Sequence, residues 1–266
     1  MKLEHIVVAT DASDVAGGAY AAALDLAARA SARVTVMRTI GRWRVTVGAY
    51  VDGSAAELER LEEWVTSVAA PSGVPVKVGI EFGHPSVEIP RFAEANAADL
   101  LAIGRKPRTQ AMRFRAGVTA DAVVRRSQVP CLLVPPDSAP VRRVLAAVDG
   151  SLRGSKVFVV ASEFARLIGA ALRAVTVEAV AEDEMPDLAR RAPRARTAQL
   201  RSEVGARLSV RHGSVFEQVL AEIRDSGADL LAIGNQRGGP PGVVELGSVG
   251  RHLAHAAPCA VLTIPL

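Results

Sequence analysis

The chain has 266 residues, of which 49% are hydrophobic, 23% charged and only 4% aromatic, a composition that indicates a folded α/β protein and excludes a disordered chain. The net charge of +4 is too small to argue for nucleic acid, and two cysteines cannot make a disulfide scaffold or a zinc cluster. The first residues lack the long apolar core of a signal peptide, and no later run reaches membrane-spanning length. We therefore expect a cytoplasmic protein whose partners include neither membranes nor nucleic acid.

Short β-branched apolar runs alternate along the chain with longer, Ala-rich segments of helical period, which predicts parallel strands joined by helices. The first half predicts strands at Ile6–Thr10, Val34–Arg38, Val76–Ile80, Leu100–Gly104 and Cys131–Val134. Its helices are expected at Ala16–Ala30, Ala55–Ala69, Ser86–Ala95 and Val118–Arg126. The second half predicts strands at Val144–Val148, Leu172–Val177, Arg207–Val210, Leu230–Gly234 and Ala260–Ile264. The predicted fold class is α/β, with two tandem, doubly wound, five-stranded parallel sheets.

The second half repeats the first. Ile6–Asp11 recurs as Val144–Asp149, Ala98–Gly104 recurs as Ala228–Gly234, and a Pro-Cys pair opens the last strand of each half, at Cys131 and Cys259. Such a repeat indicates a duplicated domain. We expect one domain at 1–137 and another at 141–266, with the prolines between them forming a short, stiff linker. The two domains should pack as a pseudo-dimer within the chain, and their closing strands are the expected contact because bare apolar edges are hazardous.

A glycine-rich segment follows the fourth strand of the second copy, from Gly234 to Gly247 and Ser248. Glycines allow close backbone approach, and the free N–H groups of a helix N-terminus together with a serine hydroxyl can bind an anion. The spacing is neither that of a P-loop nor that of the dinucleotide fingerprint. By itself, the segment indicates either a phosphate cradle or a flexible connection with an ordinary helix N-cap.

Taken together, the Asp149-Gly150-Ser151 end of strand one, the run ending at Gly234, the Gly-Ser pair and the Pro-Cys closing strand resemble the universal stress protein family over nearly the whole chain. The resemblance implies a Rossmann-like fold of the adenine nucleotide alpha hydrolase type. ATP-binding members carry the pattern G-x2-G-x9-G-[S/T] after strand four, so the resemblance implies ATP, with Mg²⁺ only as its companion ion. The residues implied to bind it are Ala147, Asp149 (ribose and adenine), Val177 (adenine), Gly234, Gly247, Ser248 and Val249 (phosphates).

Both copies depart from that pattern. In the second copy Arg237 stands where the second glycine belongs and Gly238 follows one step late. We expect Gly238 or Gly239 to adopt the special conformation and Arg237 to aid phosphate binding; the alternative is a solvent-facing arginine on a loop that does not close over phosphate. In the first copy the matching positions hold Pro107, which has no N–H, and Val118, which has no hydroxyl. The sequence therefore predicts a nucleotide site in the second copy and a degenerate site in the first.

Two further groups leave alternatives open. Five cations, Arg105, Lys106, Arg108, Arg113 and Arg115, gather on the loop that lost its glycine, and they could bind phosphate, contact a nucleic-acid backbone or simply be solvated. His252 and His255 lie three apart on the expected last helix and could share a metal ion or form a solvated pair.

No serine has a histidine and a carboxylate in a recognisable nucleophile context, and there is no P-loop lysine, so no catalytic residue is assigned. The expected function is that of a stress-response regulator, which binds an adenine nucleotide and presents a nucleotide-dependent surface to protein partners. The alternatives are a nucleotide-independent scaffold and a slow ATPase. A further homodimer of the whole chain is compatible with the sequence.

Overall fold

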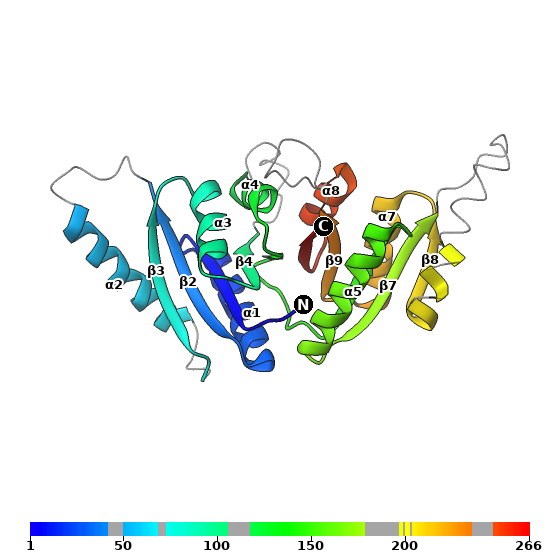
Figure 1. Ribbon diagram of the computed structural model, residues 1–266, viewed down its shortest axis with the longest axis horizontal. Coiled ribbons are helices and arrows are strands. Elements are labelled where there is room, and N and C mark those ends of the chain that lie inside the picture. Colours follow the sequence, from blue (N-terminus) through cyan, green and yellow to red (C-terminus); the bar gives the residue numbers. More distant parts are fainter. Residues whose placement is uncertain are drawn as a thin grey trace.

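The computed structural model describes residues 1–41, 50–68, 73–105, 118–178, 197–198, 200–202, 204–235 and 247–266. Within these residues ten strands form one continuous sheet in the order β3-β2-β1-β4-β5-β10-β9-β6-β7-β8 (Figure 1). In the first half the strands are β1 His5–Thr10, β2 Arg33–Ile40, β3 Val76–Phe82, β4 Leu100–Gly104 and β5 Cys131–Val134. In the second half they are β6 Arg143–Ala147, β7 Ala171–Glu178, β8 Leu208–His212, β9 Leu230–Asn235 and β10 Ala260–Pro265.

Each half is a parallel, doubly wound sheet with its first strand in the middle. Strand β1 pairs in parallel with β2 and β4, and β6 pairs in parallel with β7 and β9. The outer pairs β2–β3, β4–β5, β7–β8 and β9–β10 are parallel as well. In each half, therefore, the strand order reverses between the first and the fourth strand, which is where such sheets bind ligands.

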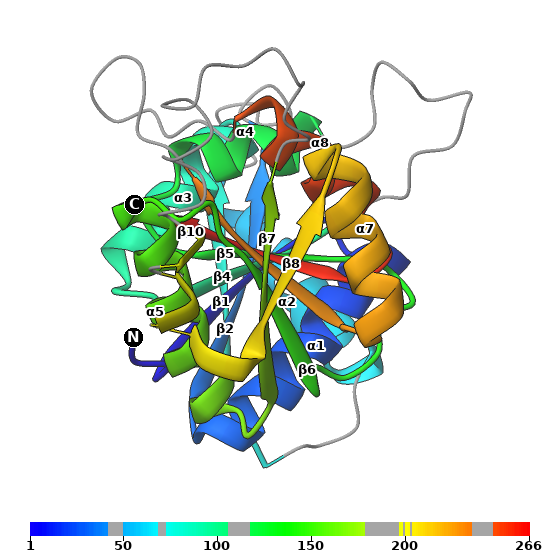
Figure 2. The same cartoon turned by 90° about the vertical axis from the view of Figure 1, so that its right-hand side faces the viewer.

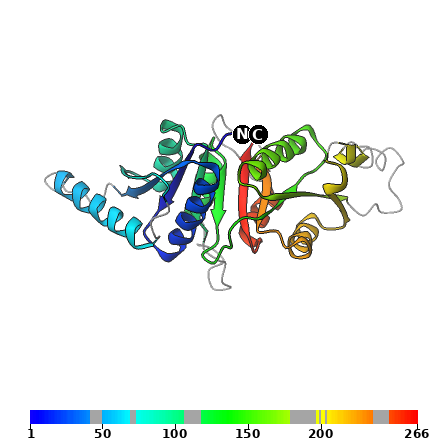
Figure 3. The same ribbon diagram turned by 90° about the horizontal axis from the view of Figure 1, so that it is seen from below.

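The two halves join through their closing strands. Strands β5 and β10 pair antiparallel, with Leu132 opposite Leu262 and Leu133 opposite Val261, and they lie side by side at the centre of the molecule (Figure 3). All four side chains are buried. The prediction that the closing strands cover each other's edges is confirmed, and the pairing makes one sheet out of two.

Helices cover both faces of the sheet (Figure 2, where α5 and α7 flank the strands). The helices are α1 Asp14–Ala30, α2 Tyr50–Val68, α3 Pro85–Ala95, α4 Val118–Arg126, α5 Leu152–Leu167, α7 Val215–Ser226 and α8 Ser248–Ala256, with a short 3₁₀ turn η3 at Gly205–Arg207. One core layer includes buried residues of α1 and α5, and the other includes buried residues of α3, α4, α7 and α8. Each layer runs through both halves, so the core is shared across the junction.

The predicted elements are recovered with small shifts at their ends. Strands β4 and β5 and helix α4 have the predicted bounds, whereas Arg207, predicted to open a strand, belongs to η3 and the strand begins at Leu208. Val148 lies one residue beyond β6. Cys131 and Cys259 are buried and unpaired as expected, and burial raises the pKa of each thiol to about 11. None of the helices in the described part of the chain has the length and apolar character needed to cross a bilayer.

Candidate functional site

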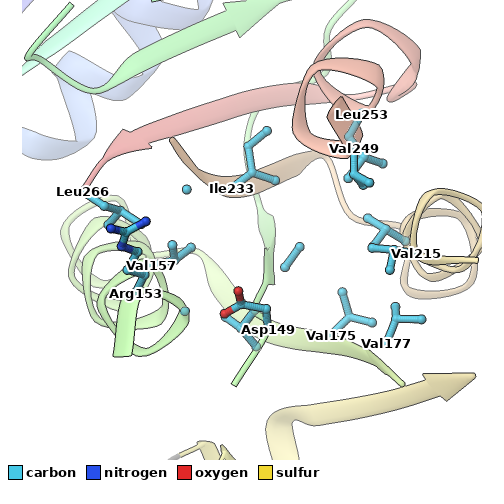
Figure 4. A pocket seen from close by; sticks show the side chains of 15 residues that line it. Asp149, Arg153, Val157, Val175, Val177, Val215, Ile233, Val249, Leu253 and Leu266 are labelled. Atoms are coloured by element: carbon cyan, nitrogen blue, oxygen red, sulfur yellow. The ribbon is translucent and has the colours of Figure 1, made fainter. Parts of the chain in front are cut away.

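A pocket of about 200 Å³ opens in the second copy at the carboxyl ends of β6, β7 and β9 (Figure 4). It lies between the first and fourth strands of that copy, where the strand order reverses. Helix α5 borders it on one side, and α7 and α8 border it on the other. Its lining comprises Ala147, Val148, Asp149, Arg153, Gly154, Val157, Val175, Val177, Val215, Val219, Ile233, Gly234, Val249, Leu253 and Leu266.

The wall of the pocket is mostly aliphatic. Val175 and Val177 project from β7 because residues two apart on a strand point to the same face. Val215 at the start of α7 and Val249 at the start of α8 face them across the opening, and these two side chains are 43% and 38% exposed. This arrangement makes a slot with apolar sides, which suits a flat heterocycle better than a strongly hydrated group.

Asp149 is held at the floor of the slot by the turn that follows β6. Its Oδ1 accepts hydrogen bonds from the Ser151 N–H at 3.1 Å and from the Ser151 hydroxyl at 2.6 Å. The turn requires Gly150 with a φ of 71°, and Ser151 caps α5 by accepting from the Gly154 N–H at 3.1 Å. A Cβ at Gly154 would lie 2.6 Å from Asp149 Oδ1, so this glycine leaves room for the carboxylate.

Two residues close the pocket near Gly234. A Cβ on Gly234 would lie 2.7 Å from Leu266 Cδ1 and 2.8 Å from Val157 Cγ2, so both side chains occupy the space above the glycine. Arg153, in the first turn of α5, lies beside Leu266 (Figure 4). Among the described lining residues, Arg153 is the one cation and Asp149 the one anion.

Helix α8 begins at the edge of the pocket. Gly247 is the N-cap and Ser248 the first helical residue. Within the described residues, no side chain caps the first turn of the helix with a hydrogen bond. No atom of the described residues lies within 4 Å of a Cβ built on Gly247, so none of them crowds this position. The first N–H groups of a helix have no partner within the helix, and in such a place they can bind an anion.

Five of the residues implied by the resemblance meet in this pocket: Ala147, Asp149, Val177, Gly234 and Val249. Gly247 and Ser248 adjoin it at the start of α8, whereas Arg237 and Gly238 lie outside the described residues. Sequence reasoning missed Arg153, Val157 and Leu266. Arg153 had a detectable signal, because it lies four residues after Asp149, close to the end of a predicted strand.

The matching region of the first copy keeps the turn and differs at the end of β2. Asp11 Oδ1 accepts from the Ser13 N–H at 3.1 Å, as Asp149 does from Ser151. Thr39 stands in place of Val177, and its buried hydroxyl oxygen has no hydrogen-bond partner in the described part of the chain, so a polar group lies where the second copy has an aliphatic one. Pro107 and Gly117 lie outside the described residues.

Two interpretations of charged residues need correction. Arg105 was expected on a basic loop, but it is only 5% exposed and hydrogen-bonds three carbonyls of the second copy. The reason is that it directly follows β4, next to the junction; the other four cations of that loop lie outside the described residues. His255 was expected in a solvated pair or a metal site, but it is 8% exposed and bonds Asp121. His252 instead meets the Phe216 ring edge-on at 6.1 Å.

A metal ion has no ready-made site in the part of the chain that the structure describes. No three His, Cys, Asp or Glu side chains come together there with a geometry that could hold an ion. The described lining of the pocket is an apolar slot with one carboxylate.

The fold and the pocket together define a tandem Rossmann-like α/β protein with a pocket at the switch point of its second half. The model of the family described as "Universal stress protein family" matches residues 2–135 and 140–265. The chain therefore belongs to the universal stress protein family, and the resemblance seen in the sequence is confirmed.

Known relatives agree with this assignment. A candidate universal stress protein of Staphylococcus haemolyticus is 29% identical over 144 residues, which cover 52% of this chain and 87% of the relative. Another from Staphylococcus saprophyticus is 30% identical over 144 residues, covering 52% and 86%. The crystal structure of a universal stress protein from Archaeoglobus fulgidus superimposes with a TM-score of 0.77 at 19% identity and covers 98% of both chains. The last likeness shows that the tandem fold of the whole chain has a counterpart.

Proposed function

We propose that the second copy binds an adenine nucleotide, ATP in the first instance, and that the chain acts as a nucleotide-dependent regulator in the cytoplasm. The observation that carries the proposal is the meeting of Ala147, Asp149, Val177, Gly234 and Val249 in one pocket at the switch point of the sheet. These residues come from three strands, the turn after β6 and a helix, and the resemblance had implied all of them for one ligand.

The pocket suits the three parts of the ligand differently. The aliphatic sides formed by Val177 and Val215 fit a purine ring, and Asp149 can accept a hydrogen bond from a ribose hydroxyl through its Oδ2 while Ser151 holds its Oδ1. A cavity of about 200 Å³ is smaller than the roughly 300–1,000 Å³ typical of ligand sites. The base and sugar would therefore fill it, and the phosphates would lie outside, before the open N-terminus of α8.

The phosphate end of the site depends on three contributions. Gly247 and Ser248 would supply backbone N–H groups and a hydroxyl, as at other helix N-termini that bind phosphate. Arg237 would add a guanidinium and Gly238 the conformational freedom that the family's second glycine normally gives. A companion Mg²⁺ would be bound mainly by the phosphates, and no residue of the chain is proposed to act as nucleophile or base.

The test compares two matched substitutions by isothermal titration of the full chain with ATP. Asp149→Ala should weaken binding at least tenfold, because it removes the ribose contact. Asp11→Ala removes the corresponding carboxylate from the same kind of turn in the first copy, and it should leave the affinity unchanged. Equal losses in the two variants, or two equivalent sites in the wild type, would contradict an assignment to the second copy alone.

A second measurement addresses the nucleotide itself. Mass analysis of small molecules released by denaturing the purified protein should give an adenine nucleotide in a ratio of at most one per chain. If nothing is released and no adenine nucleotide binds on titration, the nucleotide-independent scaffold is the better description. If ATP binds and phosphate is released steadily, with the release lost on Ser248→Ala, the slow ATPase is favoured.

A further inference from the structure

Helix α8 connects the pocket to the junction between the copies. Near its start Val249 and Leu253 line the pocket, and near its end His255 faces the first copy. The His255 Nε2 atom lies 2.8 Å from Oδ1 and 2.9 Å from Oδ2 of Asp121, which belongs to α4 (Figure 1 shows α4 and α8 as neighbours at the centre). A helix of nine residues spans only about 13 Å, so the two ends of α8 are close enough to move together.

The carboxyl end of α8 is capped by a side chain from the first copy. Arg105 donates from Nη1 to the His255 carbonyl at 2.8 Å, and from Nη2 to the carbonyls of Ala257 at 2.7 Å and Cys259 at 3.0 Å. The last carbonyls of a helix lack partners within the helix, and charged donors satisfy them most strongly. A cation at this position also interacts favourably with the helix dipole.

The matching residues of the second copy are of other types. Gly104 matches Gly234, so the position of Arg105 is held in the second copy by Asn235. Counting from the first residues of α4 and α8, Asp121 matches Arg251 and His255 matches Arg125. The reciprocal pair would therefore be two arginines, which repel each other. Among the described residues, the first copy thus contacts α8 through an arginine and an aspartate, whose counterparts in the second copy are Asn235 and Arg251.

We propose that Arg105 and Asp121 are positioning residues for the nucleotide pocket of the second copy: they fix the carboxyl end of α8 and thereby the place of its amino end, where Val249 lies and the phosphates would bind. The first copy is then a brace for a site that it does not itself contain. The inference deepens the proposed function and depends on it for the identity of the ligand, but the fixing of α8 is a property of the chain without ligand.

The first experiment titrates the full-length protein with ATP. Asp121→Ala should weaken ATP binding about five- to tenfold, within the usual range of coupling between sites. Asp121→Glu, which keeps the charge, should recover most of the loss. Arg125→Gln is the matched control on the same helix α4, at the position that corresponds to His255, and should bind ATP like the wild type. A purely structural role for Asp121 would lower the unfolding temperature and leave the affinity of the folded protein unchanged, and that result would overturn the proposal.

The second experiment needs no ligand. Amide hydrogen exchange in the unliganded protein should become faster in Asp121→Ala along all of α8, including its first turn after Ser248, while the strands β6 to β8 keep their protection. If the wild type binds no adenine nucleotide, the proposed function fails, and this measurement alone decides whether the first copy positions α8. If amide exchange in the first turn of α8 is unchanged, the proposal that the first copy positions α8 is refuted, even if ATP binds normally.

Discussion

The two copies have the same strand order and the same turn after their first strand, and they differ in the side chains near that turn. Both keep an aspartate and a serine after the first strand, and both place the residue between them in the left-handed region, with φ of 61° at Ala12 and 71° at Gly150. The second copy lines its strand ends with aliphatic side chains, whereas the first has a buried, unpartnered hydroxyl at Thr39. The two copies therefore share the backbone conformation of this turn and differ in a side chain at the matching strand end.

At the junction it is the first copy that supplies the charged side chains. Arg29 and Arg105, both from the first copy, donate to carbonyls of the second: Arg29 Nη1 to Val141 at 2.8 Å and Ile168 at 2.9 Å, and Arg105 as described. The matching positions in the second copy are Leu167 and Asn235, which carry no charge. In a symmetric homodimer both subunits carry the same residue at each position of the interface. Donors on one side and uncharged residues at the matching positions of the other require two different sequences, which the tandem chain provides.

The largest effect that would sharpen this comparison is expected at Gly247. Gly247→Val should reduce ATP binding by at least a hundredfold, because the side chain fills the open space before the N-terminus of α8 where phosphate would approach. The fold should tolerate it, since a Cβ there meets no atom of the described residues within 4 Å. Titration and thermal unfolding of the same preparation check the two statements; a variant that binds normally would exclude phosphate from this position.

The next effect concerns the paired glycines that end the fourth strands. Gly104→Ala places a Cβ 2.7 Å from the backbone oxygen of Val15, so α1 must shift, at a cost of about 2 kcal/mol in the free energy of unfolding. In Gly234→Ala the nearest atoms of the described residues belong to the side chains of Leu266 and Val157 and not to backbone, and we expect a loss below about 1 kcal/mol. Urea unfolding of both variants measures the difference, and equal losses would mean that the two copies pack alike here.

A smaller effect is expected at the turn after each first strand. Ala12→Gly should stabilise the protein by about 0.5–1 kcal/mol, because it relieves an alanine held at positive φ. Gly150→Ala should destabilise it by about 1 kcal/mol for the same reason. Chemical denaturation of the two variants tests whether the turns are equivalent in backbone conformation, and effects of the same sign would show that they are not.

The smallest effect is a pH dependence of the unfolding free energy that arises in the first copy. Burial lowers the pKa of His5, whose ring bonds the Asn96 carbonyl at 3.0 Å and the Thr35 hydroxyl at 2.8 Å; the second copy has Arg143 at this position. The unfolded chain therefore binds a proton more readily than the folded one, so the stabilisation is complete above pH 6.5 and is lost as the pH falls through the lower, folded pKa. The decrease in unfolding free energy below pH 6.5 should be shallower in His5→Gln.

Much of the fold could be predicted from the sequence because its information is local and repeated. The apolar runs Leu100–Gly104 and Cys131–Val134 gave strands with the observed bounds, since a buried parallel strand needs a continuous apolar stretch. The junction was predictable for the same reason, because both closing strands are apolar on each face. Five residues of the pocket followed from a resemblance that spans the whole chain.

What could not be predicted depends on contacts with the backbone across long separations. Arg105 stands first in a run of cations, and nothing in the sequence of that run distinguishes it from the others. Its partners are carbonyls about 150 residues away, and every residue has a carbonyl, so they leave no mark in the sequence. Leu266 was missed in a similar way, because its position over Gly234 depends on where β10 ends relative to β9.

The antiparallel pairing of β5 and β10 has a consequence for how the protein responds to dilution. Two separate chains joined along such an edge come apart as their concentration falls, and their stability depends on that concentration. Here a linker of a few residues between β5 and β6 keeps the two edges at a high effective concentration, so the junction forms regardless of how much protein a cell contains. The unfolding temperature should accordingly be the same at nanomolar and at micromolar protein.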